Sequence, residues 1–165
     1  MSFEPRIVGI VVYSQTGNTL SVAERVQQEI ERRGHRCDLL RPQIEGDDRP
    51  GRKHYEFTSP PDVVVYDSLI FAAPVHGFSL ATPMGSYMRQ VATLQGKLVS
   101  LFVTHQFPYA WMGGNRAVSQ MRAHVAARGG IIGETGVVSW SNRKREQEIA
   151  RLVQRIGGQF ASLKQ

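Results

Sequence analysis

The stretch Ser14-Gln15-Thr16-Gly17-Asn18-Thr19 lies between an apolar run, residues 7–13, and a segment with helical periodicity. Three of its side chains carry hydroxyl groups, and its one glycine tolerates the backbone conformations of a tight turn. A turn from a strand into a helix leaves backbone N–H groups without intrahelical partners, and the helix dipole places partial positive charge at that end. A phosphate group can bind there without a lysine or an arginine. We therefore expect a phosphate site after the first strand, although a hydroxyl-rich N-cap without a ligand has the same composition.

Apolar runs alternate with helical patterns along the rest of the chain, an order typical of a parallel sheet with crossover helices. The first run is nearly continuous in Ile and Val, as in a central strand that is buried on both faces. The expected strands are residues 6–13, 35–41, 68–73, 97–104 and 131–140. Gly133 and Gly136 interrupt the last strand and indicate a bulge or a split strand.

Apolar residues at helical spacing predict the connecting helices. Their stripes are Val22, Ala23, Val26 and Ile30; Val118, Met121 and Val125; and Ile149, Leu152, Val153, Ile156 and Phe160. Another helix should run from Thr82, as its N-cap, through Pro83 to about Ala92. Ser141 or Asn142 should cap the last helix.

Residues 42–60 break this alternation, because prolines and glycines stand among charged residues where a doubly wound sheet normally has its second helix. A loop of this length is unusual inside a compact domain. Two interpretations are open. The helix is reduced to a turn near residues 61–65, or the segment is a mobile excursion over the surface.

Length and composition are those of one soluble globular domain spanning residues 1–165. Hydrophobic residues make up 41% of the chain and charged residues 21%, and no apolar run approaches the ~20 residues of a membrane helix. The first residues lack the pattern of a secretory signal, so we expect a cytoplasmic protein without a membrane span. Cys37 is the single cysteine, and we interpret it as a small strand residue rather than a catalytic one.

The formal net charge of +6 and the isoelectric point near 9.9 raise the question of nucleic-acid binding. Basic residues are spread over the expected helices, and their tight cluster, residues 143–145, has no aromatic residues interleaved with it. No nucleic-acid partner is therefore expected. Solvated helix faces account for most of the basic residues. Alternatively, the excess charge attracts an acidic protein partner or an anionic cofactor.

Ligands of an open α/β sheet bind at the carboxyl ends of the strands where the strand order reverses, so the loops after the first, third and fourth strands should line one crevice. The first loop is residues 14–19. The second consists of Pro74, Val75, His76, Gly77 and Phe78. The third offers Thr104, His105, Phe107, Tyr109, Trp111, Gly113 and Gly114. Hydroxyls, amides and aromatic rings together suit a flat anionic ligand, although the aromatic residues could also plug the sheet end or contact another subunit.

Residues 14–19 resemble the [ST]-x-T-G-x-T phosphate loop of the flavodoxin family, and the alternation of elements over nearly the whole chain is similar too. The resemblance implies a five-stranded parallel sheet of order 2-1-3-4-5, with helices on both faces, that binds FMN noncovalently. It also implies that Ser14, Thr16, Asn18 and Thr19 hold the phosphate. Residues 74–78 would correspond to the second flavin loop, and residues 104–114 to the third.

Two features depart from the family's usual pattern. Flavodoxins are typically acidic, whereas this chain is basic, and their third loop is glycine-rich and acidic, whereas here it reads His-Gln-Phe-Pro-Tyr-Ala-Trp-Met from residue 105.

Three functions follow from the resemblance. The first is an electron carrier that docks on a redox partner protein, which we favour because no nicotinamide-binding fingerprint is visible. The second is an enzyme in which NAD(P)H reduces FMN and a quinone or another small acceptor takes the electrons. The third is a nonredox interaction module that has lost its flavin.

Other site classes are disfavoured by residue order and spacing. Residues 77–81 nearly match the G-x-S-x-G nucleophile elbow, but no aspartate follows Ser79 and no histidine follows Glu134. The first loop lacks the lysine of a nucleotide-binding P-loop. His76 and His105 follow strand ends without carboxylates or cysteines at ligand spacing, so no metal site is expected.

Overall fold

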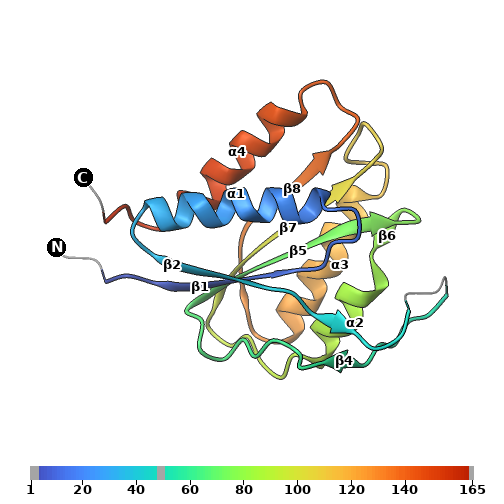
Figure 1. Ribbon diagram of the computed structural model, residues 1–165, viewed down its shortest axis with the longest axis horizontal. Coiled ribbons are helices and arrows are strands. Elements are labelled where there is room, and N and C mark those ends of the chain that lie inside the picture. The colour runs from blue at the N-terminus through green and yellow to red at the C-terminus, as the bar shows by residue number, and fades with distance from the viewer. Residues whose placement is uncertain (1–3, 48–50, 164–165) are drawn as a thin grey trace.

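The computed structural model describes residues 4–47 and 51–163 (Figure 1). Its main sheet contains five mutually parallel strands: β1 (Ile7–Val12), β2 (Arg36–Leu40), β5 (Ser68–His76), β7 (Leu98–His105) and β8 (Ile131–Ser139). Their order is β2-β1-β5-β7-β8, which confirms the expected order 2-1-3-4-5. Because the strands are parallel, the carboxyl ends of β1, β5 and β7 lie at one edge of the sheet, and the strand order reverses between β1 and β5.

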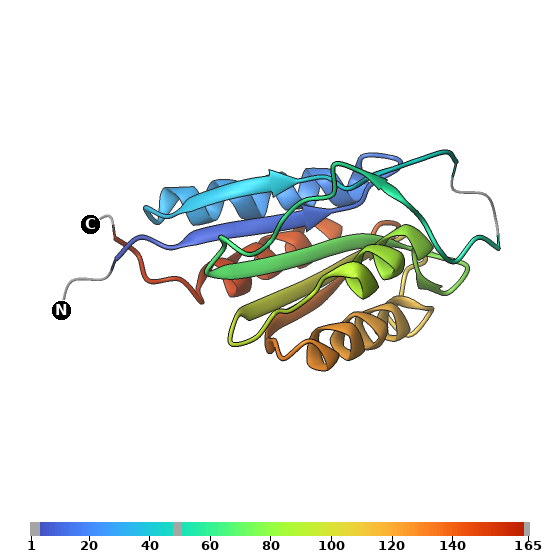
Figure 2. The same ribbon diagram turned by 90° about the horizontal axis from the view of Figure 1, so that it is seen from below.

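Helices cover both faces of this sheet. α1 (Asn18–Arg32) and α4 (Arg145–Gly157) lie together on one face, and α2 (Thr82–Gln90) and α3 (Gly114–Ala127) lie on the other (Figures 1 and 2). None of the helices in the described ranges is long and apolar enough to cross a membrane.

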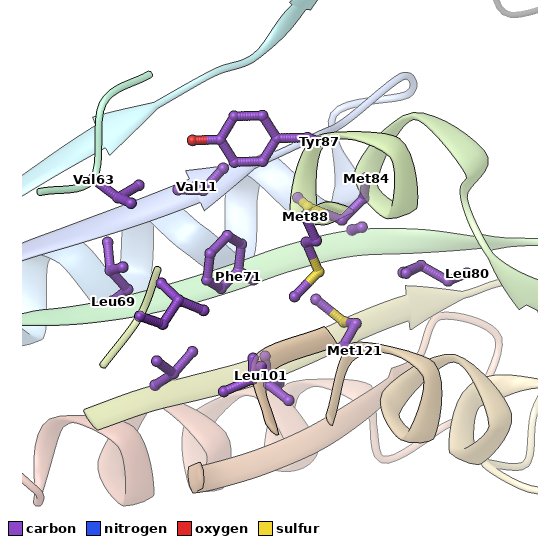
Figure 3. Close-up of a cluster of buried hydrophobic side chains, with 14 of the residues drawn as sticks. Val11, Val63, Leu69, Phe71, Leu80, Met84, Tyr87, Met88, Leu101 and Met121 are labelled. Carbon is purple, nitrogen blue, oxygen red and sulfur yellow. The ribbon is translucent and has the colours of Figure 1, made fainter. Parts of the chain in front are cut away.

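Two hydrophobic layers hold the helices to the sheet, because successive side chains of a strand point to opposite faces. Val11 of β1 packs with Phe71, Met84 and Met121 under α2 and α3 (Figure 3). Met88 is the third methionine of this layer. Val8, Ile10 and Val12 of β1 point to the opposite face and pack against α1 and α4. The expected stripes of those helices are buried in this second layer and consist of Val22, Ala23, Val26, Ile30, Ile149, Leu152, Val153, Ile156 and Phe160.

The segment that replaces the second helix is a short antiparallel pair, β3 (Gln43–Ile44) and β4 (Phe57–Thr58). Tyr55 is fully buried beneath α2, and its backbone N–H donates to Ser86 Oγ at 2.9 Å. Tyr55 and Phe57 therefore cover the sheet face that a helix would otherwise cover. A turn at residues 64–65 agrees with the first interpretation of this region, and residues 48–50 lie outside the described ranges.

The third strand is longer than expected. β5 continues through Pro74, Val75 and His76, which the sequence placed in a loop, because β6 (Ser79–Leu80) pairs with the last two of them in antiparallel register. Gly77 and Phe78 form the connection, with φ of 54° and 64°. Positive φ at both central residues is the geometry of a tight hairpin turn that matches the twist of the strands.

Two helix starts differ from the predictions. Ala81, not Thr82, is the N-cap of α2, and the Thr82 hydroxyl instead hydrogen-bonds Tyr55 Oη at 3.0 Å. α4 begins at Arg145, because Asn142 Oδ1 accepts the Lys144 N–H at 2.8 Å and forms a separate turn before the helix.

The expected bulge in the last strand is confirmed. Val99 pairs with Ile132 and Leu101 pairs with Thr135, so β8 holds one extra residue beside Gly133. Gly136 serves helix packing, since a Cβ there would lie 2.5 Å from Leu152 Cδ1 of α4.

Candidate functional site

The turn from β1 into α1 places a helix N-terminus at the carboxyl edge of the sheet. Gly17 is the N-cap, with φ of 93°, and it supplies no side-chain cap. Ser14 Oγ accepts the Leu20 N–H at 3.3 Å, which closes the loop over the first helical turn. The N–H groups of Asn18 and Thr19 donate to no other residue of the described chain. Unpaired N–H donors and the positive end of a helix dipole are the features that favour an anion at a helix N-terminus.

A buried hydrogen bond joins the first loop to the third. Thr19 Oγ1 lies 2.7 Å from Thr104 Oγ1, at the end of β7, and both side chains are buried. Thr16 and Gln15, in contrast, are exposed. The structure therefore gives the hydroxyls different positions: Thr16 faces solvent, and Thr19 contacts the sheet.

The three predicted loops meet in a cavity of about 110 Å³. It is lined by Gln15, Thr16, Asn18, Pro74, Val75, His76, Thr104, His105 and Gln106. None of these described lining residues is acidic. Gln106 is the member that the sequence did not single out, and its position between His105 and Phe107 is the signal that could have identified it.

A larger hollow, of about 440 Å³, adjoins the first loop on its β2 side. Ser14 and Gln15 line it together with Arg41, Pro42 and Gln43 and with further residues of β1 and the β3 segment. The first loop thus borders two open spaces, and of these two only the smaller one is lined by residues from all three predicted loops.

His105 is fixed by a bond from its Nε2 to Ser139 Oγ at 2.8 Å. Burial lowers the pKa of His105, and the backbone of Met112 opposes this shift. This shift favours the neutral form of the ring, and the buried Nδ1 makes no hydrogen bond of normal length and angle among residues 4–47 and 51–163. No group of three or more metal-ligating side chains occurs in those ranges either.

Aromatic side chains border this edge of the sheet in two stacked pairs. Phe78 stacks on Phe107 with ring centroids 4.9 Å apart, and Tyr109 stacks on Trp111 at 6.3 Å. All four are exposed, Trp111 most of all at 74%. Their exposure distinguishes them from a buried hydrophobic plug.

Glycines bring the second and third loops together. A Cβ at Gly113, which has φ of 97°, would lie 2.6 Å from the Phe78 Cα, so the hairpin turn packs directly against this position. A Cβ at Gly114 would lie 2.6 Å from Val137 Cγ1 and would push α3 from β8. Gly77, Phe78, Phe107, Tyr109, Trp111, Gly113 and Gly114 surround the region without lining the small cavity.

Comparison with known proteins identifies this architecture. No protein-family model matches the chain, and no curated protein matches it. Among solved structures, a flavodoxin of Streptococcus pneumonia TIGR4 is similar with a TM-score of 0.64 at 15% identity, over 93% of this chain and 99% of the other. The chain has a flavodoxin-like fold.

Other similar structures share this flavodoxin-like fold. A flavodoxin from the domain Archaea matches with a TM-score of 0.63 at 15% identity, over 93% of this chain and 97% of its own. A flavoprotein in complex with FMN from Lactobacillus acidophilus NCFM matches with a TM-score of 0.64 at 17% identity, over 87% and 98%. In this fold the loops after β1, β5 and β7 lie at the point where the strand order reverses.

Proposed function

We propose that this chain binds FMN noncovalently where its first, second and third loops meet, and that it transfers electrons through the bound flavin. One observation carries the proposal: Gln15, Thr16 and Asn18 of the first loop meet residues 74–76 and 104–106 in one cavity that has no acidic residue in its described lining. The similarity to flavodoxins and to a flavoprotein in complex with FMN supports it.

The first loop fits a phosphate group. Ser14, Thr16 and Asn18 offer polar side chains, and the first turn of α1 offers backbone N–H groups. Each good hydrogen bond to a charged phosphate contributes roughly 1.5–3 kcal/mol. Apart from its neighbours in the chain and the backbone of its own helix, no described residue places an atom within 4 Å of the Cβ position of Gly17, so the backbone there is open to a ligand. Thr19 contributes by holding this loop to β7 through Thr104.

The exposed aromatic pairs fit the flat part of the same cofactor. Phe78 and Phe107 belong to the second and third loops, and Tyr109 and Trp111 extend the aromatic surface. Stacking of one ring on a planar ligand contributes about 0.5–1.5 kcal/mol. FMN, when bound, supplies one- and two-electron chemistry, and these residues bind and orient it. The neutral His105 adds no charge at the cavity.

Of the two redox functions, carrier and reductase, we favour an electron carrier that docks on a protein partner. The aromatic edge is exposed and the chain carries a net charge of +6, so an acidic partner surface would be attracted to it. The NAD(P)H-dependent reductase is the second candidate, favoured by a separate cavity whose lining includes Lys53, Arg89 and Arg116 and no acidic residue of the described chain, a lining that suits an organic phosphate.

The cofactor proposal is tested by the visible spectrum of the purified protein, followed by titration of the colourless protein with FMN. Flavin absorption and release of FMN on denaturation are expected. A colourless protein that cannot be reconstituted would contradict both redox functions and would favour the interaction module. Rapid NAD(P)H oxidation with a quinone acceptor, by the purified protein alone, would contradict a pure carrier.

A further inference from the structure

A second cavity, of about 580 Å³, lies against α2 and α3. Its residues are Lys53, Ser79, Leu80, Thr82, Gly85, Arg89, Arg116, Gln120, Ala123 and His124. It shares none of them with the cavity of the three loops. Its size lies within the range of small-molecule sites. Four side chains of the lining are basic, and Ser79, Thr82 and Gln120 add two hydroxyl groups and an amide. No acidic residue of the described ranges contributes to the lining.

Two of these basic side chains meet beside Gly85 of α2. A Cβ at Gly85 would lie 3.5 Å from Arg89 Nη1 and 4.0 Å from His124 Nε2, so these two nitrogens border the same space. Glycine keeps that space open. Arg89 Nη2 donates to the Lys53 carbonyl at 2.7 Å, which anchors one guanidinium edge and leaves Nη1 at the cavity.

The other basic side chains have no structural partner to explain their position. The side chains of Arg116 and His124 form no hydrogen bond or ion pair with any residue in the parts of the chain that the structure describes. Arg128, close by, is different, because it donates to the carbonyls of Val91 and Arg89 at the end of α2. The guanidinium groups of Arg89 and Arg116 carry like charges without an acidic residue in the described lining, and an anion relieves their repulsion.

Neutral donors complete the cavity. Gln120 Oε1 accepts the Leu80 N–H at 2.8 Å, which fixes the amide and leaves its Nε2 donors for a ligand. Thr82 and Arg89 stand at opposite ends of α2, about 10 Å apart along the helix axis. The space is therefore long enough for a phosphate and for an organic group attached to it.

We propose that this cavity binds the phosphate or diphosphate group of a small organic phosphate. The concave shape and the fixed neutral donors favour a small molecule over an acidic protein segment, which would need only an open basic surface. Arg116, Arg89 and His124 would hold the anion, with Gln120 as a neutral donor. The proposal does not depend on FMN binding.

The test uses inorganic pyrophosphate as the probe and the five histidine ring signals as reporters in NMR titrations at about 0.15 M salt, where exposed charges are screened. If the protein binds FMN, the FMN-saturated form is used, so that the first loop is filled. Burial, and after it Arg128 and Arg89, lower the pKa of His124. Pyrophosphate at the cavity should shift the His124 signals and raise that pKa.

Arg116→Gln is the decisive variant, because Arg116 is exposed and its loss should not affect folding. We expect it to weaken pyrophosphate binding about tenfold. Arg151→Gln is the matched control, since it removes the same charge from an exposed position of α4 on the other face of the sheet, and it should change the affinity less than about twofold.

Three outcomes would overturn the proposal. Shifts of His76 and His105 without shifts of His124 would place the anion at the three-loop cavity. Equal weakening by both arginine variants would indicate attraction to net charge alone. ADP, a small organic diphosphate, should displace pyrophosphate more strongly than a glutamate hexapeptide does. Equally strong displacement by the hexapeptide would indicate an acidic protein partner. None of these outcomes bears on the visible spectrum, so failure here is distinguishable from failure of the flavin proposal.

Discussion

Thr19 and Thr104 are joined by a hydrogen bond of 2.7 Å between their Oγ1 atoms, although they stand 85 positions apart in the chain. Both side chains are buried, at 1% and 3% exposure. The bond connects the first turn of α1 with the end of β7, and therefore holds the candidate phosphate loop against the third loop.

Single replacements at this pair should destabilise the protein. Thr19→Val or Thr104→Val leaves the other hydroxyl buried without its partner, which costs about 1–3 kcal/mol of unfolding free energy. The double variant removes both polar groups and should lose clearly less than the sum of the two single losses. Urea denaturation of the four proteins measures this coupling. Strictly additive losses would show that the two hydroxyls do not depend on each other.

Thr16 offers a test of phosphate binding that leaves the fold intact. Its side chain is exposed, so Thr16→Val should keep the wild-type unfolding free energy while weakening FMN binding about tenfold through loss of a charged hydrogen bond. Flavin absorbance titration measures the affinity. Thr58→Val, an equally conservative change at an exposed residue of β4, should leave it unchanged. Unaltered affinity in the Thr16 variant would move the phosphate elsewhere.

Trp111 should report on the bound flavin. The chain has two tryptophans, Trp111 is 74% exposed, and Trp140 packs under the Arg145 guanidinium at 4.7 Å. In Trp140→Phe protein, FMN should quench most of the remaining emission, because the indole lies at the proposed ring site. Trp111→Phe protein should show much weaker quenching. The reverse pattern would remove Trp111 from the site.

His105 should make the protein less stable in acid. Because burial lowers the pKa of His105 in the folded state, its neutral form contributes stability that is present above the unfolded value near 6.5 and is lost as pH falls through the folded pKa. The unfolding free energy of the wild type should therefore fall as the pH drops below about 6.5, and His105→Gln should reduce this slope. His54→Gln, at a ring that is 69% exposed, is the control. The remaining slope would come in part from His124, whose pKa is lowered in the same direction.

Cys37 should be inert in the native protein. Burial raises the pKa of this thiol to about 12, and its side chain is 4% exposed in β2. A thiol reagent at pH 8 should react with it only after unfolding by denaturant, since the thiolate is the nucleophile. Fast modification of the folded protein would contradict the strand position described here.

The local pattern of the sequence was sufficient for most elements and for the position of the first loop. The nearly continuous Ile and Val of residues 7–12 predict a central strand, and the stripe of α4 predicts its buried face. These signals succeed because periodicity depends only on neighbours in the chain. The predictions for the start of α2 and for the length of β5 were wrong, because contacts between residues that are not local in the helix or strand pattern decide both features. Tyr55 attracts the Thr82 hydroxyl, and β6 extends the pairing of β5.

By itself, then, the sequence determined the sheet order, through the resemblance and the alternation of elements, and the three loops at its edge. Only the tertiary structure decided which of those residues meet. It joined Thr19 to Thr104, packed Phe78 against Gly113, and brought Arg89, Arg116 and His124 to one cavity. Such contacts depend on the distances between elements far apart in the chain, and helix propensity, strand propensity and spacing carry no information about those distances.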